Sequence, residues 1–185
     1  MLKEEGLNIL YSIGYYGPII LSTALILIIV NTELTNLTTL TNHLLYIILM
    51  NAFTIEFNGV LKNIIKQPRP KKLIKINRQD VKHSKTYGMP SGHAQLAVTN
   101  LVYLSLFTKN NIITTISSFI ALLTLYQRYV FRMHTLSQIV CGSIVGYITG
   151  YLFYKAYLCI FKKDAESNNN KTNNKTNNKT NNKSN

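Results

Sequence analysis

Long apolar runs constrain this chain more than any other feature of its sequence. Five of them can be drawn, over about residues 9–30, 44–61, 90–107, 112–129 and 136–161. A helix needs about 20 predominantly apolar residues to cross the hydrocarbon core of a bilayer, and in lipid only helices and closed barrels satisfy every backbone polar group. The sequence therefore predicts an all-α, multi-pass integral membrane protein, a helical bundle of about five transmembrane helices.

The charge of the chain, +13 overall, lies mostly between and beyond these runs. Residues 62–85 contain seven lysines and two arginines, and residues 162–185 contain six lysines. The near-repeats of Lys-Thr-Asn-Asn in residues 168–185 offer no apolar side chain to a core. We therefore expect a membrane domain over residues 1–161 and a disordered tail over 162–185. Aromatic and basic residues do not interleave in a nucleic-acid-reading motif, so we expect a membrane partner and no nucleic acid.

The number of spans predicts which segments meet. The end of the second span, the start of the third, the end of the fourth and the start of the fifth lie on one membrane face. Residues 62–69, 90–93 and 128–134 occupy these junctions. The three stretches are therefore expected to meet at one level of the bilayer, with the N-terminus on the same face and the tail on the other.

The stretch from Pro90 to His93 is typical of an anion site at a helix start. Pro90 suits the point where a helix begins, and Ser91 is a good N-cap. The first N–H groups of a helix are unpaired and carry the positive end of its dipole, and Gly92 has no side chain to obstruct them. The less specific interpretation is a capped helix start with a surface histidine.

Cationic side chains are predicted at the same level. Lys62, Arg69 and Arg128 would neutralise most of a phosphate's charge, and the planar arginine fork matches phosphate oxygens. Lysines and arginines often flank membrane spans, but this general tendency does not explain why His93 and His134 are predicted at the same level of the bilayer. Two histidines facing a phosphate cradle favour phosphoryl transfer through a phosphohistidine, with one ring as nucleophile and the other as acid. Carboxylates are nearly absent from this face, so we expect no metal and no cofactor.

Together the three stretches resemble the signature of the type 2 phosphatidic acid phosphatase superfamily, which also includes vanadium haloperoxidases and glucose-6-phosphatase. The resemblance covers roughly residues 55–150. It implies that His134 is the nucleophile and His93 the general acid, and that no metal is required. It also implies a set of phosphate ligands, namely Lys62, Arg69, Ser91, Gly92 and Arg128.

The third motif departs from the commonest pattern in two places. Gln127 precedes Arg128 where serine is usual, and Gln138 stands where aspartate is usual. The spacing of four residues puts Gln138 on the His134 face of a helix, where its oxygen can accept the imidazole N–H. Gln138 would then orient the ring without adding a negative charge. Glutamine here is also a feature of the dolichyl-diphosphatase branch and of glucose-6-phosphatase.

The dolichyl-diphosphatase branch is the one that the motifs resemble most. Its substrate is a long polyprenyl diphosphate, hydrolysed to the monophosphate in an endomembrane such as the endoplasmic reticulum if the source is eukaryotic. That branch usually has serine at Gly92, which leaves phosphatidate or another lipid or sugar phosphate as an alternative substrate. A third hypothesis is a non-catalytic membrane protein that binds anionic lipid, motivated by Gln138 and by the +8 charge of residues 62–85.

Three further expectations concern the predicted membrane domain. Asn58 lies four residues before Lys62 and faces the same way, whereas Glu56 lies round the helix from the site. His43, at the far end of the second span, is expected to be inert. The positive charge of the site face favours a cytosolic site, whereas the resemblance favours a lumenal one.

Overall fold

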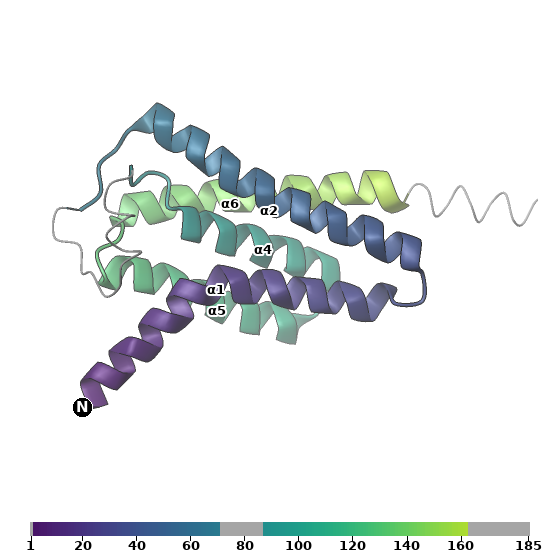
Figure 1. The fold of residues 1–185 in the computed structure, drawn as a ribbon, viewed down its shortest axis with the longest axis horizontal. Helices are drawn as coiled ribbons and strands as arrows, with labels where there is room; N and C mark the ends of the chain where they lie inside the picture. The colour runs from purple at the N-terminus through teal and green to yellow at the C-terminus, as the bar shows by residue number, and fades with distance from the viewer. Residues whose placement is uncertain (1, 71–86, 163–185) are drawn as a thin grey trace, which may run out of the picture. The chain divides into compact units, whose positions relative to one another are not determined.

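The computed structural model of the protein describes residues 2–70 and 87–162. Its helices are α1 (Leu2–Glu33), α2 (Leu37–Ile65), α4 (Gly92–Thr108), α5 (Asn111–Val130) and α6 (Leu136–Tyr157), with a short π-helix, η1 (Leu158–Lys162), after α6 (Figure 1). No strand occurs in the described ranges, so the predicted all-α fold is confirmed. Residues 71–86 and 163–185 lie outside the described residues, and with them most of the basic stretch over residues 62–85 and of the predicted tail over 162–185.

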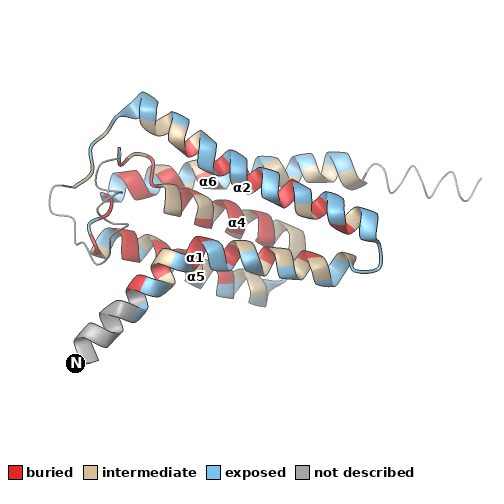
Figure 2. Ribbon diagram, in the orientation of Figure 1, coloured by how far each residue is buried: buried red, intermediate tan, exposed pale blue. Residues whose placement is uncertain are grey.

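Three stretches of helix are long and apolar enough to cross a membrane by themselves, Tyr11–Glu33, Leu37–Ile65 and Leu136–Phe161. α4 has only 17 residues, and neither α4 nor α5 meets the same standard. Many large apolar side chains are exposed, for example those of Leu45, Ile48 and Leu49 on α2. Figure 2 shows that much of α2 is exposed. The chain is therefore an integral membrane protein, and the spanning of α4 and α5 stays a prediction that depends on their packing between neighbours.

α4 is the inner helix of the bundle. It packs against α1, α2 and α5, and α6 contacts it through a stripe of glycines. Buried residues are dense along α4 (Figure 2), and they include polar ones such as Gln95, Thr99 and Asn100. Polar side chains are tolerated there because they face other helices and find partners: Asn100 donates to Asn51 Oδ1 at 2.9 Å.

The glycine stripe of α6 sets how closely α6 approaches α4. Its members are Gly142, Gly146 and Gly150. A Cβ at the first would lie 2.5 Å from the Ser91 carbonyl oxygen, and a Cβ at the third 2.6 Å from that of Thr99. Small residues at every fourth position let two helices approach backbone to backbone. The start of α6 is thereby held against the start of α4, where the motifs lie.

The end of α2, the start of α4, the end of α5 and the start of α6 gather at one end of the bundle, toward the left of Figure 1. α1 also begins at this end, since Tyr11 packs against Phe131 and Met133 in the turn after α5. The predicted convergence of the three motif stretches is therefore seen in the structure.

One predicted boundary was wrong. The second apolar run is drawn from about residue 44, which leaves residues 31–43 as a predicted loop between the first two spans. α2 instead begins at Leu37, and Asn36 caps it by accepting a hydrogen bond from the Thr39 N–H at 3.1 Å. The helix persists through threonines because its inner face is packed. His43 is fully buried there, and its Nε2 lies 2.9 Å from the Tyr103 hydroxyl.

The chain forms two compact units, Met1–Tyr151 and Leu152–Asn185. The first unit contains every motif residue. In the second, the described residues carry ring contacts between Tyr154 and Tyr157 and between Tyr157 and Phe161. The domain boundary predicted at residue 161 stays a prediction.

Candidate active site

His134 lies in the tight turn between α5 and α6. Its backbone N–H and that of Met133 both donate to the Arg128 carbonyl, at 3.2 and 3.0 Å. The side chain is 3% exposed, so the ring is almost wholly removed from solvent. The turn therefore presents a buried imidazole six residues after Arg128, which lies in the last turn of α5.

The orientation of the Gln138 amide follows from two neighbours, one of which can only donate a hydrogen bond and one of which can only accept. The Thr135 backbone N–H can only donate, and it lies 3.2 Å from Gln138 Oε1. The Pro68 carbonyl can only accept, and it lies 2.9 Å from Gln138 Nε2. Gln138 Oε1 is thus an acceptor, and it lies 3.2 Å from His134 Nδ1. His134 therefore carries its proton on Nδ1 and, when neutral, has a free electron pair on Nε2.

Arg69 faces that electron pair. Its Nη1 donates to His134 Nε2 at 3.2 Å and to the Met133 carbonyl at 3.0 Å. Arginine can only donate, so this contact agrees independently with an unprotonated Nε2. In the resting protein, the nitrogen suited to attack is held by the cation expected to bind phosphate.

The surroundings of His134 keep its ring neutral. Burial has the largest effect in lowering its pKa well below the usual 6.5, and the positive charges of Arg69, Arg128 and Lys62 lower it further. The hydrogen bond with Gln138 acts in the opposite direction. Burial also lowers the pKa of Arg69 to about 10, which leaves its guanidinium charged at neutral pH.

Ser91 precedes the first turn of α4 as the sequence predicts, but its hydroxyl does not cap the helix. Its Oγ is buried and has no hydrogen-bond partner among the described residues. Its backbone instead joins two motifs, because the Ser91 N–H donates to the Gln138 carbonyl at 3.0 Å. This hydroxyl at a helix start is compatible with the prediction that Ser91 binds an anion, which stays a prediction.

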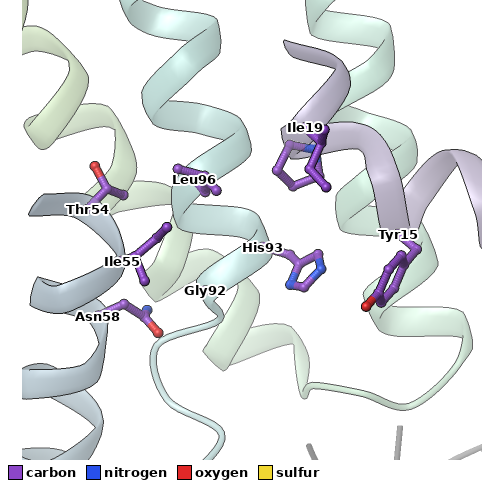
Figure 3. Close-up of a pocket in the computed structure, with 9 residues that line it drawn as sticks. Tyr15, Ile19, Thr54, Ile55, Asn58, Gly92, His93 and Leu96 are labelled. Carbon is purple, nitrogen blue, oxygen red and sulfur yellow. The ribbon is translucent and has the colours of Figure 1, made fainter. Parts of the chain in front are cut away.

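His93 borders a cavity of about 380 Å³ between α1, α2 and α4 (Figure 3). Its ring turns toward Tyr15 of α1, with ring centroids 5.5 Å apart. The Arg128 guanidinium carbon lies 5.4 Å from the centre of the same tyrosine ring. Tyr15 therefore connects the second and third motifs through an aromatic ring.

Asn58 fulfils its expected position, because it faces the site from α2. Its Nδ2 donates to the Pro90 carbonyl at 3.2 Å and to Gln95 Oε1 at 2.7 Å. Its Oδ1 points at Gly92, where an added Cβ would lie 3.0 Å away. Glu56 is exposed on α2, in keeping with its expected distance from the site. Within the described ranges, no group of three or more His, Cys, Asp or Glu side chains gathers as a metal site would require.

Three residues of the site were not found from the sequence: Tyr15, Gln67 and Gly88. Gln67 Oε1 accepts from Gln138 Nε2 at 3.0 Å, and an added Cβ at Gly88 would lie 2.6 Å from the same amide. Gln67 and Gly88 lie close in sequence to the motif residues Arg69 and Ser91, and this proximity could have marked them as candidates. Tyr15 offers no such signal, because its span carries no motif.

Comparison with known proteins finds relatives of similar sequence. The chain is 33% identical over 108 residues to the dolichyldiphosphatase of Saccharomyces cerevisiae, covering 53% of this chain and 45% of the relative. It is 31% identical over 116 residues to dolichyldiphosphatase 1 of Dictyostelium discoideum, covering 57% and 48%. The chain therefore spans about half the length of the curated relatives it matches.

A solved structure has the same fold, a PAP2 type transmembrane phosphatidylglycerolphosphate phosphatase from Bacillus subtilis. The TM-score is 0.66 at 21% sequence identity, and the match covers 83% of this chain and 77% of that one. Residues 40–160, which include all three motifs, match the PAP2 superfamily. This chain is a member of the PAP2 superfamily.

Proposed function

We propose that the protein hydrolyses a dolichyl-type polyprenyl diphosphate to the monophosphate, through a phosphohistidine on His134 and without a metal. The observation that carries this proposal is the state of the His134 ring. Gln138 holds its Nδ1–H, and its Nε2 electron pair faces Arg69 among three cations. A buried neutral imidazole in a cationic pocket is a nucleophile suited to phosphorus.

In this proposal the terminal phosphate replaces His134 as the partner of Arg69. Lys62 and Arg128 supply further positive charge, and the vacant Ser91 hydroxyl and the N–H of Gly92 at the start of α4 donate to the remaining oxygens. Charge that develops on these oxygens in the transition state is stabilised by donors that are already in place.

Two chemical steps follow. His134 Nε2 forms a bond to the terminal phosphorus while the bond from phosphorus to the bridging oxygen breaks, and His93 protonates that oxygen as the polyprenyl monophosphate leaves. His93 then takes a proton from a water molecule, whose oxygen attacks the phosphohistidine. The P–N bond breaks, inorganic phosphate is released, and both histidines return to their starting states.

The lipid tail is best accommodated by the cavity beside His93. Apolar side chains line much of it, including Ile19, Ile55 and Leu96 from three different helices (Figure 3). A leaving group protonated by His93 would have its lipid chain on this side, within the bilayer. The similarity to two eukaryotic dolichyldiphosphatases supports the polyprenyl substrate and an endomembrane such as the endoplasmic reticulum.

Gly92 favours a second candidate, hydrolysis of phosphatidate or another lipid phosphate. The dolichyl-diphosphatase branch usually has serine at this position, and the cavity beside Gly92 has no side chain there to restrict the headgroup. A panel of dolichyl diphosphate, dolichyl monophosphate and phosphatidate separates the two candidates by relative kcat/KM.

The test is phosphate release from dolichyl diphosphate in EDTA by the purified protein in detergent. We expect turnover by the wild type, none by His134→Ala, and an acid-labile phosphoprotein in a rapid quench of the wild type that is absent from His134→Ala. Equal rates for wild type and His134→Ala would refute the phosphohistidine, and loss of wild-type activity in EDTA would refute metal independence.

A further inference from the structure

Gln67 has no part in the chemistry described above, yet its side chain contacts the residue that orients the nucleophile. It lies in the turn after α2, two residues before Arg69. Its Oε1 accepts a hydrogen bond from Gln138 Nε2 at 3.0 Å. Its own carbonyl accepts from the Gly88 N–H at 2.7 Å, which ties the turn to the segment before Ser91.

Gln67 completes the hydrogen bonding of the Gln138 amide. The Nε2 group has two hydrogens, and the Pro68 carbonyl, at 2.9 Å, takes one of them. Gln67 takes the other, and the Gln138 side chain is 0% exposed, so no water replaces this acceptor. On the opposite edge, Oε1 serves both Thr135 N–H and His134 Nδ1. All four polar contacts of a buried amide are thus satisfied.

Gly88 restricts the same amide by contact. A Cβ at this position would lie 2.6 Å from both Nε2 and Oε1 of Gln138, so the glycine backbone lies directly against the amide plane. The amide is therefore held on its edges by hydrogen bonds and on one face by the backbone. Interior packing of this kind leaves little freedom for rotation about the last torsion of Gln138.

We propose that Gln67 is a positioning residue for the phosphoryl transfer, which acts through Gln138 to fix the orientation and tautomer of the His134 ring. The proposal rests on the proposed role of His134 as nucleophile. The stretch that contains Gln67 and Arg69 would then act on the His134 ring in two ways. Arg69 contacts Nε2, and Gln67 acts through Gln138 on the opposite side of the ring. Gln138 is thereby constrained to be an amide, since a carboxylate there would face two acceptors, Gln67 Oε1 and the Pro68 carbonyl.

The variant that tests it is Gln67→Met, which keeps the length of the side chain and removes the acceptor. One Gln138 hydrogen is then buried without a partner, so the amide and the ring are less well held. We expect kcat for dolichyl diphosphate to fall about fivefold to tenfold, the size typical of one lost hydrogen bond, with KM unchanged. Gln67→Asn, which withdraws the acceptor by one methylene, should show a similar loss and serves if the methionine variant does not fold.

A double-mutant cycle with Gln138→Leu identifies the route of the effect. If Gln67 acts through Gln138, Gln67→Met should lower kcat in the wild-type background and leave it unchanged in the Gln138→Leu background. The matched control is Lys66→Met, because Lys66 is exposed and precedes Gln67 directly, and it is not among the described residues that hydrogen-bond to the Gln138 side chain. It should match wild type.

A purely structural role for Gln67 predicts different results. If Gln67 only shaped the turn that carries Arg69, Gln67→Met would raise KM and would do so equally with leucine at position 138. Either result would overturn the proposal.

A spectroscopic measurement needs no substrate and so separates this proposal from the proposed function. In ¹⁵N-histidine-labelled protein, the His134 ring should show a single neutral form with its proton on Nδ1. Gln67→Met should add a second tautomer or broaden the His134 signals, while Lys66→Met should not. A wild-type spectrum in Gln67→Met would refute the positioning role even if the protein hydrolysed no polyprenyl diphosphate.

Discussion

Replacing Arg69 by methionine should separate its two effects on the site, phosphate binding and suppression of His134 protonation. Its Nη1 lies 3.2 Å from His134 Nε2, and the Arg69 charge is second only to burial among the causes that lower the His134 pKa. The variant keeps an unbranched apolar stem and removes the guanidinium, and with it both the charge and the donors. The change should therefore appear in the size of the rate and in its pH dependence.

The size of the rate loss follows from the lost contact. A hydrogen bond that involves a charged group is worth about 1.5–3 kcal/mol, and each 1.36 kcal/mol is a factor of ten in rate. If one Arg69 donor contacts the phosphate in the transition state, kcat/KM should fall about 10-fold to 150-fold. Lysine at this position should recover part of that loss, because it restores the charge but not the planar fork.

The direction of the pH effect follows from the charge. In the wild type the depressed pKa keeps His134 neutral well below pH 6.5, so the acid limb of kcat/KM, if it reports this group, lies below that value. Removing a nearby positive charge makes protonation of the ring less unfavourable, so the His134 pKa rises. The acid limb of Arg69→Met should therefore move to higher pH.

The assay is phosphate release from dolichyl diphosphate between about pH 4 and pH 9, a range that extends well to both sides of the ordinary histidine pKa. Lys66→Met is the matched control, since it removes one charge from the same turn but from an exposed side chain. Titration of the substrate is common to both variants. The reasoning would be refuted by an acid limb that does not move in Arg69→Met relative to Lys66→Met, or that moves to lower pH.

Three further predictions concern other parts of the site. Ser91→Ala should lower kcat/KM about twofold to tenfold without lowering the melting temperature, because the buried hydroxyl has no hydrogen-bond partner among the described residues; a lower melting temperature would contradict this. Gly146→Ala should destabilise the protein by about 1–3 kcal/mol, since the added methyl meets the α4 backbone, whereas Gly59→Ala, with open space at its Cβ, should not; equal melting curves would argue against close packing of α6. Tyr15→Leu should lower kcat/KM about threefold by removing the ring beneath Arg128, and Tyr15→Phe should retain it; equal losses would exclude a role for the ring.

Local spacing was enough to predict several features of the site. The spacing of four residues predicted the contact between His134 Nδ1 and Gln138 Oε1, which are 3.2 Å apart. The predicted helical geometry was wrong, however, because His134 lies in the turn before α6 begins at Leu136. The start of α4 after Ser91 was likewise predicted from local residue preferences. The meeting of the motifs at one end of the bundle required only the number and order of the apolar runs.

Packing overrode local preference at two positions. The threonines near the start of α2 favour a loop by propensity, yet burial of His43 and Leu40 extends the helix to Leu37. Ser91 has the residue type of a capping side chain, but its hydroxyl makes no hydrogen bond to the helix N–H groups. A propensity describes the average environment of a residue type, and the packing around a particular residue can depart from that average.

The sequence by itself determined the all-α membrane class, the level at which the motifs meet and the residue types available there, because each depends on hydropathy or on spacing within one helical turn. Only the tertiary structure decided that Arg69 donates to Nε2 of His134, 65 residues away, and that Gln67 accepts from the side-chain amide of Gln138, 71 residues away. The same holds for the position of Tyr15 beneath Arg128. These contacts depend on the path of a turn and on the rotation of each helix about its axis. Both are set by the packing of all helices together, through contacts such as the glycine stripe of α6 against α4.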